Sequence, residues 1–341
     1  MKFLRFLLFP FDIIYDLVTT IRNLFFDVGI FKQTSFKIPV IVVGNLSVGG
    51  TGKTPQIEYL IRLLHNQFKV AVLSRGYKRK TKGFVLLSDA HSALDVGDEP
   101  LQYFKKFNNI DVAVDANRVE GIQKLIKSKA SDVILLDDAY QHRKVKGSFY
   151  ILLTKYNDLF TDDFLLPTGN LRESRSGAKR ADVVIVTKCP TNLTLQQQET
   201  IKRKLQKYQK KIFFTTISYG AILSSKNTIS INELKSYQVL LVTGIANPKP
   251  LLDFLSDKQI NFKHLKYADH HNFSKNEAKI ISQEFEAIAS TKKIILTTEK
   301  DFVRLENSIK NLFYIPIETS FLENQKDSFN KEVMSHIKDF S

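Results

Sequence analysis

Cysteine is almost absent from this chain: among its 341 residues there is a single one, Cys189. An intramolecular disulfide is therefore impossible, which fits a reducing cytosolic setting, and a metal site built from a cysteine cluster is excluded. Because Cys189 follows an apolar run, we expect it to be a small buried hydrophobic residue.

Acidic residues are scarce relative to basic ones. The chain has 35 Asp and Glu against 50 Lys and Arg, which gives a formal net charge of +15. Such an excess favours an anionic partner, namely nucleic acid, anionic lipid or a phosphorylated substrate. Charge alone does not choose among the three.

A long apolar run is also missing. Residues 1–31 are the most apolar stretch, but charged residues interrupt it before it reaches the ~20 apolar residues that a transmembrane helix needs. The stretch is also a poor signal peptide, since the apolar block Phe6–Phe11 is short, Asp12 follows it, and no small-residue cleavage site appears.

The polar positions of this N-terminal arm repeat with a helical period. Steps of seven, four, seven and four residues separate Arg5, Asp12, Asp16, Asn23 and Asp27. They form one stripe of a helix whose other faces are apolar, and Pro10 is expected to kink or divide it. So wide an apolar face needs an apolar partner. Two remain open: the core of the protein itself, or a membrane interface, which Lys2, Arg5 and the basic charge favour.

The rest of the chain predicts an α/β fold. Short apolar strand candidates alternate with helical stretches such as Thr54–Asn66; the strands are Pro39–Val43, Lys69–Leu73, Asp132–Leu136, Phe149–Leu153, Val183–Thr187, Val239–Thr243 and Ile294–Thr298. This alternation is typical of a parallel sheet with helices on both faces. We expect about two domains after the arm (residues 1–36): a core over 37–215 and a smaller α/β domain over 216–341.

The stretch VVGNLSVGGTGKTPQ at 42–56 predicts a phosphate-binding loop between a strand and a helix. The strict pattern G-x-x-x-x-G-K-[ST] fails because Ser47 stands at its first glycine. The phosphate-facing half is intact: its glycines allow backbone N–H groups to face an anion at a helix N-terminus. Lys53 is expected to reach the β- and γ-phosphates, and Thr54 to hold Mg²⁺.

Three other stretches carry acid–base or metal chemistry. VILLDDAYQH ends an apolar strand in Asp137 and Asp138, which is typical of the carboxylates that face Mg²⁺ beside such a loop. VGDEP holds Asp98 and Glu99, and YADHHNF holds Asp269, His270 and His271. An Asp–His pair can take a proton from an alcohol, although a stretch of this kind is more often a loop or a helix cap. A double histidine could bind metal, but no third ligand is spaced to support that.

Together these stretches resemble the tetraacyldisaccharide 4′-kinase family, the lipid A 4′-kinases of Gram-negative bacteria. The resemblance covers almost the whole chain, in the blocks IPVIVVGNLSVGGTGKTP, LSRGY, VGDEP, LLDDAYQH, LPTGNLRES, VTGIANP, DHHNF and TTEKD. Ser47 fits that family, whose loop reads G-N-x-x-x-G-G-T-G-K-T-P. Ala139 and Tyr140 depart mildly from its D-D-G-F-Q-H.

The resemblance implies a P-loop NTPase-like core with a smaller C-terminal lid domain. It implies ATP-dependent phosphorylation of the 4′-hydroxyl of a tetraacylated glucosamine disaccharide 1-phosphate, giving lipid IV-A. It also implies a monotopic protein on the cytoplasmic face of the inner membrane, with the arm in the interface. We expect no nucleic-acid partner, and we infer no protein partner.

The resemblance also implies roles for particular residues. The residues implied to bind ATP are Asn45, Gly49, Gly50, Thr51, Gly52, Lys53, Thr54 and Arg75. Those implied to bind Mg²⁺ are Thr54, Asp137 and Glu99. The implied catalytic residues are Asp98, His270, Lys53 and Asp138, of which the first two deprotonate the sugar hydroxyl. The smaller domain is then expected to close so that His270 meets Asp98.

Further candidates follow from the same blocks. Substrate or phosphate contacts are expected from Arg75, Tyr77, Arg172 and Glu173. The nucleotide side of the cleft is expected to include Glu299, Lys300 and Asp301.

Two other classes of protein compete with a kinase. A GTPase or a partition-type ATPase would share the loop, but in VIVTKCP, Thr187 and Pro190 replace the Asn and Asp of the guanine-reading N-K-x-D. A nucleic-acid-dependent ATPase would suit the charge, yet the basic residues are scattered and no DNA- or RNA-binding signature appears. Transfer of phosphate to a lipid separates the kinase from both.

Overall fold

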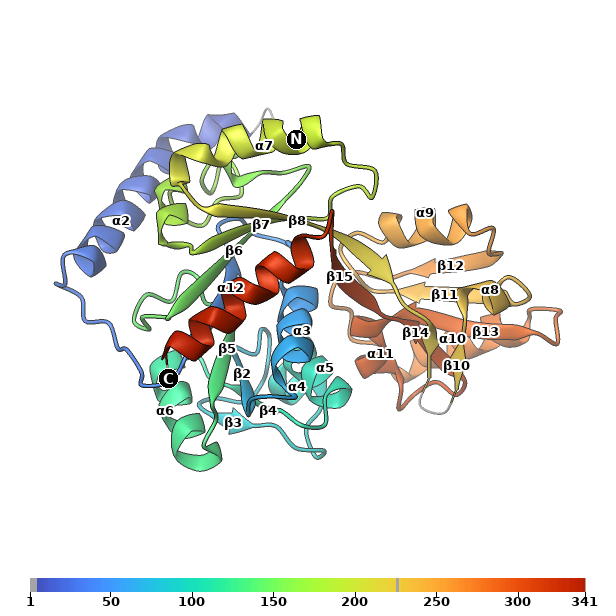
Figure 1. Ribbon diagram of the computed structural model, residues 1–341. Coiled ribbons are helices and arrows are strands. Elements are labelled where there is room, and N and C mark those ends of the chain that lie inside the picture. Colours follow the sequence, from blue (N-terminus) through green and yellow to red (C-terminus); the bar gives the residue numbers. More distant parts are fainter. Residues whose placement is uncertain (1–4, 225–226, 341) are drawn as a thin grey trace.

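The computed structural model describes residues 5–224 and 227–340 (Figure 1). A large sheet has the strand order β15-β8-β7-β6-β1-β5-β2-β4-β3, parallel except for β3 and β15 at its two edges. Its strands are β1 (Val40–Asn45), β2 (Val70–Ser74), β3 (Val85–Leu86), β4 (Asp111–Val114), β5 (Val133–Asp137), β6 (Phe149–Lys155), β7 (Val183–Thr187), β8 (Lys211–Tyr219) and β15 (Ile317–Phe321).

Helices cover both faces of this sheet, as the unbroken apolar strands predict. Ile41 and Val43 of β1 pack in one core with α3 (Lys53–Leu64), α5 (Asp98–Lys106) and α12 (Gln325–Phe340). Val40 and Val42 face the opposite core, which includes α6 (Arg118–Lys129). A third core packs α7 (Leu195–Leu205) on β6 and β7. A short helix α4 (Ala93–Val96) and 3₁₀ turns η1 (Phe6–Leu8), η2 (Phe160–Asp162), η3 (Arg175–Arg180) and η4 (Gln206–Tyr208) complete this unit.

A second sheet forms the smaller unit, at the right of Figure 1. Its order is β10-β9-β14-β13-β11-β12, and the strands are β9 (Ile222–Leu223), β10 (Thr228–Ile229), β11 (Gln238–Thr243), β12 (Phe262–Lys266), β13 (Lys293–Thr298) and β14 (Leu312–Ile315). The helices of this unit are α8 (Ile231–Leu234), α9 (Lys249–Asp257), α10 (Lys275–Glu286) and α11 (Glu299–Leu305). α9 packs on one face of the sheet, and α10 and α11 on the other.

The C-terminal end of the chain corrects the expected domain limits. Residues 216–341 were assigned to the smaller domain, but β15 pairs with β8 in the large sheet, and α12 buries Phe329, Val333 and Ile337 in the large core. The smaller unit is therefore an insertion whose chain enters through β8 and leaves through β15. The physical reason is that α12 has an apolar stripe at steps of four residues, and the uncovered sheet face beside α3 is where that stripe is buried.

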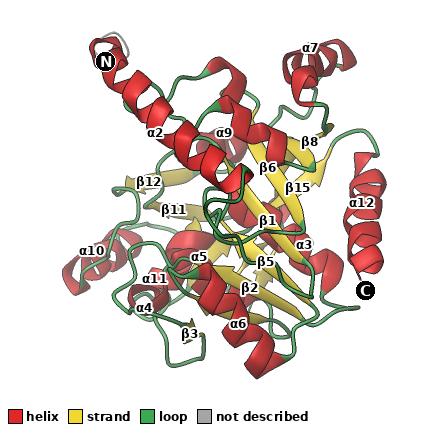
Figure 2. Ribbon diagram, turned by 90° about the vertical axis from the view of Figure 1, so that its left-hand side faces the viewer, coloured by secondary structure: helices red, strands yellow, loops and turns green. Residues whose placement is uncertain are grey.

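The N-terminal helix α2 (Phe9–Asp27) lies on the outside of the large unit (Figures 1 and 2). α2 is uninterrupted from Phe9 to Asp27 because Pro10 occupies its first turn, where a missing N–H costs nothing. The 3₁₀ turn η1 precedes it, so the arm is divided next to Pro10, as expected. None of the described helices, over residues 5–224 and 227–340, is both long and apolar enough to cross a bilayer.

The polar stripe of α2, not its apolar face, packs on the protein. Asp12 and Asn23 are buried, and Asn23 Nδ2 donates to Glu173 Oε2 at 2.9 Å. Arg143 binds Asp27 at 2.6 Å. Exposed large apolar side chains cover the outer face: Leu8, Phe9, Phe11, Ile13, Ile14, Leu17, Val18, Ile21, Leu24 and Val28. The alternative in which this face packs on the protein's own core is therefore wrong.

Candidate active site

The glycine-rich loop connects β1 to α3 at the carboxyl end of the large sheet. Gly49 and Gly52 have φ of +97° and +88°, which favours glycine because a Cβ is strained there. The Asn45 side chain donates to the carbonyl of Ser47 at 2.6 Å, which fixes the half of the loop that departs from the strict pattern. Thr187 Oγ1 donates to the carbonyl of Thr51 at 2.8 Å. These two contacts fix the backbone of the loop on both sides.

Lys53 and Asp138 meet in front of this loop. Lys53 Nζ lies 3.4 Å from Asp138 Oδ1 and 3.4 Å from Asn45 Oδ1. Arg172 NH1 binds both carboxylate oxygens of Asp138, at 3.1 and 3.2 Å. Burial raises the pKa of Asp138, but the charges of Lys53 and Arg172 outweigh burial and lower it. Asp138 is therefore an anion between two cations.

The pKa of Asp137 is shifted in the opposite direction to that of Asp138. Burial, followed by the charge of Asp138, raises the pKa of Asp137 to about 7. Its Oδ2 accepts from Ser74 Oγ at 3.3 Å, while its buried Oδ1 has no partner among the described residues. The negative charge of Glu99 also acts on Asp137. An unpaired buried carboxylate oxygen beside a phosphate loop is a fit position for a cation.

The described residues hold no cluster of three His, Cys, Asp or Glu side chains of metal-binding geometry. Mg²⁺ does not require one, because it is typically held by one or two carboxylates together with phosphate oxygens and water. The donor set of Thr54, Asp137 and Glu99 suits this mode.

The structure brings Asp98 and His270 together across the two units. His270 Nδ1 lies 2.9 Å from Asp98 Oδ2. Asp98 begins α5 after Gly97, and His270 lies in the loop between β12 and α10, in the left-handed region at φ +57°. Burial raises the pKa of Asp98, but hydrogen bonds from His270 and Arg304 outweigh burial and lower it. A carboxylate that stays ionised can orient the imidazole and stabilise an imidazolium.

The other nitrogen of His270 faces Lys300. Lys300 Nζ lies 3.0 Å from His270 Nε2 and 3.1 Å from Glu99 Oε1. Since an ammonium only donates, Nε2 is the acceptor in this contact, and the imidazole proton is on Nδ1, toward Asp98. This tautomer leaves Nε2 able to accept a proton from an alcohol that takes the place of Lys300.

Comparison with known proteins decides the family. A family model described as "Tetraacyldisaccharide-1-P 4'-kinase" matches residues 4–338. The chain belongs to this family. Curated tetraacyldisaccharide 4'-kinases of Flavobacterium johnsoniae and Flavobacterium psychrophilum are 53% and 52% identical, over 99% of this chain and 99% and 98% of theirs. As a member, the chain is a tetraacyldisaccharide 4′-kinase of lipid A biosynthesis, as its sequence blocks predict.

A solved structure supports the fold. The LpxK structure from Aquifex aeolicus in complex with ATP has a TM-score of 0.79 and 30% identity, covering 98% of this chain and 99% of that one. The α/β architecture with its large parallel sheet is shared with that kinase.

Several predicted positions have structural contacts in the kinase. Glu299 is buried, and its Oε1 lies 2.6 Å from Lys106 Nζ. Asp301 accepts from the Gly244 N–H at 2.9 Å and from Thr298 Oγ1, which fixes the start of α11. His271 binds Glu277 at 2.8 Å and takes no part in the pair. Both residues therefore have structural contacts, and the nucleotide-side role expected of Glu299 and Asp301 stays a prediction.

Glu173 is buried and binds the N-terminal arm, so it does not face an open site. It is 1% exposed and binds Arg180 at 2.8 Å, Asn23 at 2.9 Å and Gln141 at 3.0 Å. Its charge is satisfied by these contacts inside the protein.

Four cations act on His142, and of these the sequence pointed only to Arg75. Burial, together with the charges of Arg118, Lys144, Arg22 and Arg75, lowers the pKa of His142 to about 4. Arg75 is exposed after β2, Arg118 begins α6, and Arg22 comes from α2. These cations come from four separate segments, so no local motif announces the cluster.

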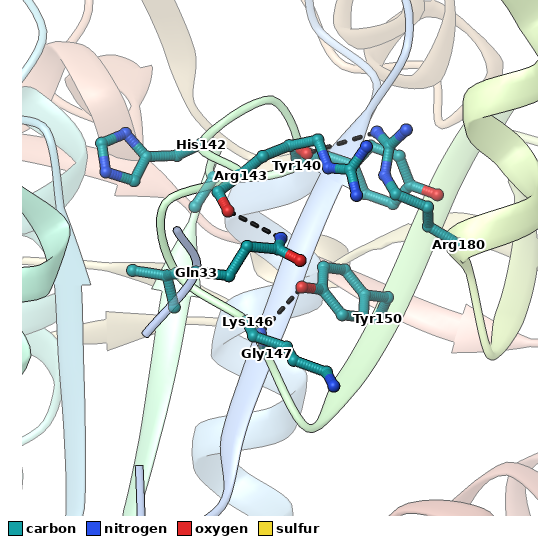
Figure 3. Close-up of a pocket in the computed structure, with 10 residues that line it drawn as sticks. Gln33, Tyr140, His142, Arg143, Lys146, Gly147, Tyr150 and Arg180 are labelled. Atoms are coloured by element: carbon teal, nitrogen blue, oxygen red, sulfur yellow. Dashed lines mark hydrogen bonds between the residues drawn. The ribbon is translucent and has the colours of Figure 1, made fainter. Parts of the chain in front are cut away.

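A cavity of about 170 Å³ lies behind the DDAYQH loop (Figure 3). Gln33, Arg143, Tyr150 and Arg180 line it, and the ring of His142 turns away from them. Its lining includes neither the phosphate loop nor the Asp98–His270 pair. The cavity is therefore separate from the chemistry described above.

Proposed function

We propose that the kinase transfers the γ-phosphate of ATP to the 4′-hydroxyl of tetraacyldisaccharide 1-phosphate, giving lipid IV-A, with the residues described above as its machinery. The observation that carries this proposal is the Asp98–His270 pair, assembled from two units with an ionised carboxylate at 2.9 Å from the imidazole. A pair of this kind suits proton removal from an alcohol.

In this mechanism the sugar 4′-oxygen forms a bond to the γ-phosphorus while the bond to the β–γ bridging oxygen breaks. The hydroxyl proton passes to His270 Nε2, and Asp98 stabilises the resulting imidazolium. Asp98 is not the acceptor, because Arg304 and His270 occupy both of its oxygens. Lys53 offsets negative charge on the transferred group, and Asp138 holds the Lys53 ammonium in place.

Thr54, Asp137 and Glu99 would hold Mg²⁺ beside the loop, and the metal would supply positive charge to offset that of the phosphates. ATP is held by the loop residues Gly49, Gly50, Thr51 and Gly52 with Asn45 at its entry. Arg75, which is exposed after β2, is the candidate contact for the 1-phosphate of the substrate.

The test is an assay with γ-labelled ATP and tetraacyldisaccharide 1-phosphate in detergent micelles. We expect labelled bisphosphorylated lipid with Mg²⁺ present, and a rate at least about 10²-fold lower after chelation, since metal neutralises charge that builds up during transfer. Phosphate released to water without labelled lipid would mean a nucleotide hydrolase. An unchanged rate after chelation would remove the metal from the mechanism.

We also propose that α2 lies in a membrane interface, on the cytoplasmic face of the inner membrane. Its polar stripe is occupied by the protein, and its apolar face is exposed, so apolar contact is available only outside the described chain. A multiply acylated substrate stays in the bilayer, so its kinase has to bind at the surface.

Charge on the apolar face is therefore expected to weaken membrane binding. Ile14 and Leu17 are 60% and 59% exposed, so Ile14→Asp with Leu17→Asp leaves the protein contacts intact. Vesicle co-sedimentation is expected to fall at least about 10-fold, while the melting temperature stays within about 2 °C. Thr20→Asp, a polar position of the same helix, is the control. Equal sedimentation of the double variant and the wild type would count against the interfacial arm.

A further inference from the structure

The guanidinium of Arg304 contacts both partners of the Asp98–His270 pair. Its Nε and NH2 bind the two oxygens of Asp98, at 2.6 and 2.7 Å. Its NH1 donates to the carbonyls of His270 and His271, both at 2.6 Å, and to Asn272 Oδ1 at 3.0 Å. One side chain of α11 thus joins the N-terminus of α5 to the loop that carries the histidine.

We propose that Arg304 is the positioning residue of this kinase, which assembles the pair by fixing the carboxylate on one side and the histidine loop on the other. This inference rests on the roles proposed above for Asp98 and His270. A planar guanidinium suits the task because its donors form a rigid fork that matches a carboxylate and still leaves a nitrogen for carbonyl groups.

Asp98 and His270 are both groups that depend on contacts such as those of Arg304. Asp98 is 2% exposed, and a buried carboxylate that lost its cation would be left with an uncompensated charge. His270 has a backbone φ of +57°, a conformation that residues other than glycine seldom adopt without support from neighbours. The carbonyl contacts of Arg304 at His270 and His271 supply part of that support.

The competing explanation is that Arg304 only tethers the two units to each other. The chain contains another tether of that kind, which allows a comparison. Lys105 on α5 forms an ion pair with Glu306, directly after α11, so it connects the same two helices. The partners of Lys105 include neither Asp98 nor His270. Lys105→Gln is therefore a matched control that removes a tether and leaves the pair intact.

The experiment is a double-mutant cycle in the full chain, with kcat and the KM for ATP measured in the micelle assay. Arg304→Gln is expected to lower kcat about 10- to 100-fold with the KM for ATP within about 3-fold, because the group acts on proton removal and not on nucleotide binding. Arg304→Lys, which keeps the charge but loses the fork, is expected to recover at least about 5-fold of that loss. Lys105→Gln is expected to stay within about 2-fold of the wild type.

The decisive comparison is made in the His270→Ala background. If Arg304 acts through the pair, Arg304→Gln lowers the residual rate of His270→Ala by less than about 3-fold. A further loss equal to that in the wild-type background would overturn the proposal, and so would a wild-type kcat for Arg304→Gln itself. Should Arg304→Gln not fold, Arg304→Lys replaces it in the same cycle. Near-normal turnover of His270→Ala would instead contradict the proposed role of the Asp98–His270 pair, independently of the result for Arg304.

Discussion

Alanine in place of His270 is expected to lower kcat by roughly 10²–10⁴-fold, and alanine in place of Asp98 by a similar factor, because positioned proton transfer contributes about that much to a rate. The geometry gives the reason. The pair is already in contact at 2.9 Å, with an ionised carboxylate behind the ring and one ring nitrogen directed at a replaceable partner, Lys300.

The neighbouring His271 gives this experiment its control. It has the same side chain, one residue further along the same loop, but it binds Glu277 instead of Asp98. His271→Ala is expected to retain kcat within about 3-fold, since the proton-transfer pair is untouched. Near-normal kcat in both His270→Ala and Asp98→Ala would remove the pair from the mechanism.

Alanine in place of Lys53 is expected to reduce labelled lipid at least about 10³-fold, because a preorganised cation on the transferred phosphate contributes 10²–10³ or more. Lys53 is 16% exposed and sits 3.4 Å from Asp138, so its ammonium is fixed before ATP arrives. Its loss also leaves Asp138 with Arg172 as its remaining cation.

The measurement for Lys53 is formation of labelled lipid together with ATP binding by calorimetry. Lys53→Ala is expected to weaken ATP binding far less than it lowers transfer, since the backbone N–H groups of the loop remain. Lys127→Ala, at an exposed position of α6, is the control for loss of a positive charge. Substantial labelled lipid from Lys53→Ala would show that the loop does not act on the transferred phosphate.

The parts that sequence reasoning predicted well are local. The strand, loop and helix around Lys53 follow from glycine positions and apolar periodicity, as do the two aspartates, of which Asp137 ends β5 and Asp138 comes directly after it. The contact between Asp98 and His270 was expected from the resemblance, and the structure places these side chains together without further closure of the units.

The features that the sequence predicted poorly depend on segments far apart along the chain. Glu299 and Asp301 follow a strand, and their structural contacts, with Lys106 and with the Gly244 N–H, come from elsewhere in the chain. Arg304 went unnoticed, because its position has meaning only when α11 lies against α5, more than 200 residues away along the chain: the separation between Arg304 and Asp98 is 206. The return of β15 and α12 to the large sheet was missed for the same reason.

The sequence by itself determined the family, the phosphate loop, the carboxylates at the end of β5 and an arm with one polar stripe. The family follows from blocks spread over almost the whole chain. The loop, the carboxylates and the arm are each a pattern within about 30 consecutive residues, where spacing alone dictates which side chains share a face. Tertiary structure decided that the polar stripe of α2 faces inward, that the second sheet is an insertion, and that Arg304 holds the Asp98–His270 pair. Those outcomes rest on buried charges and apolar faces finding partners far along the chain, which no local pattern specifies.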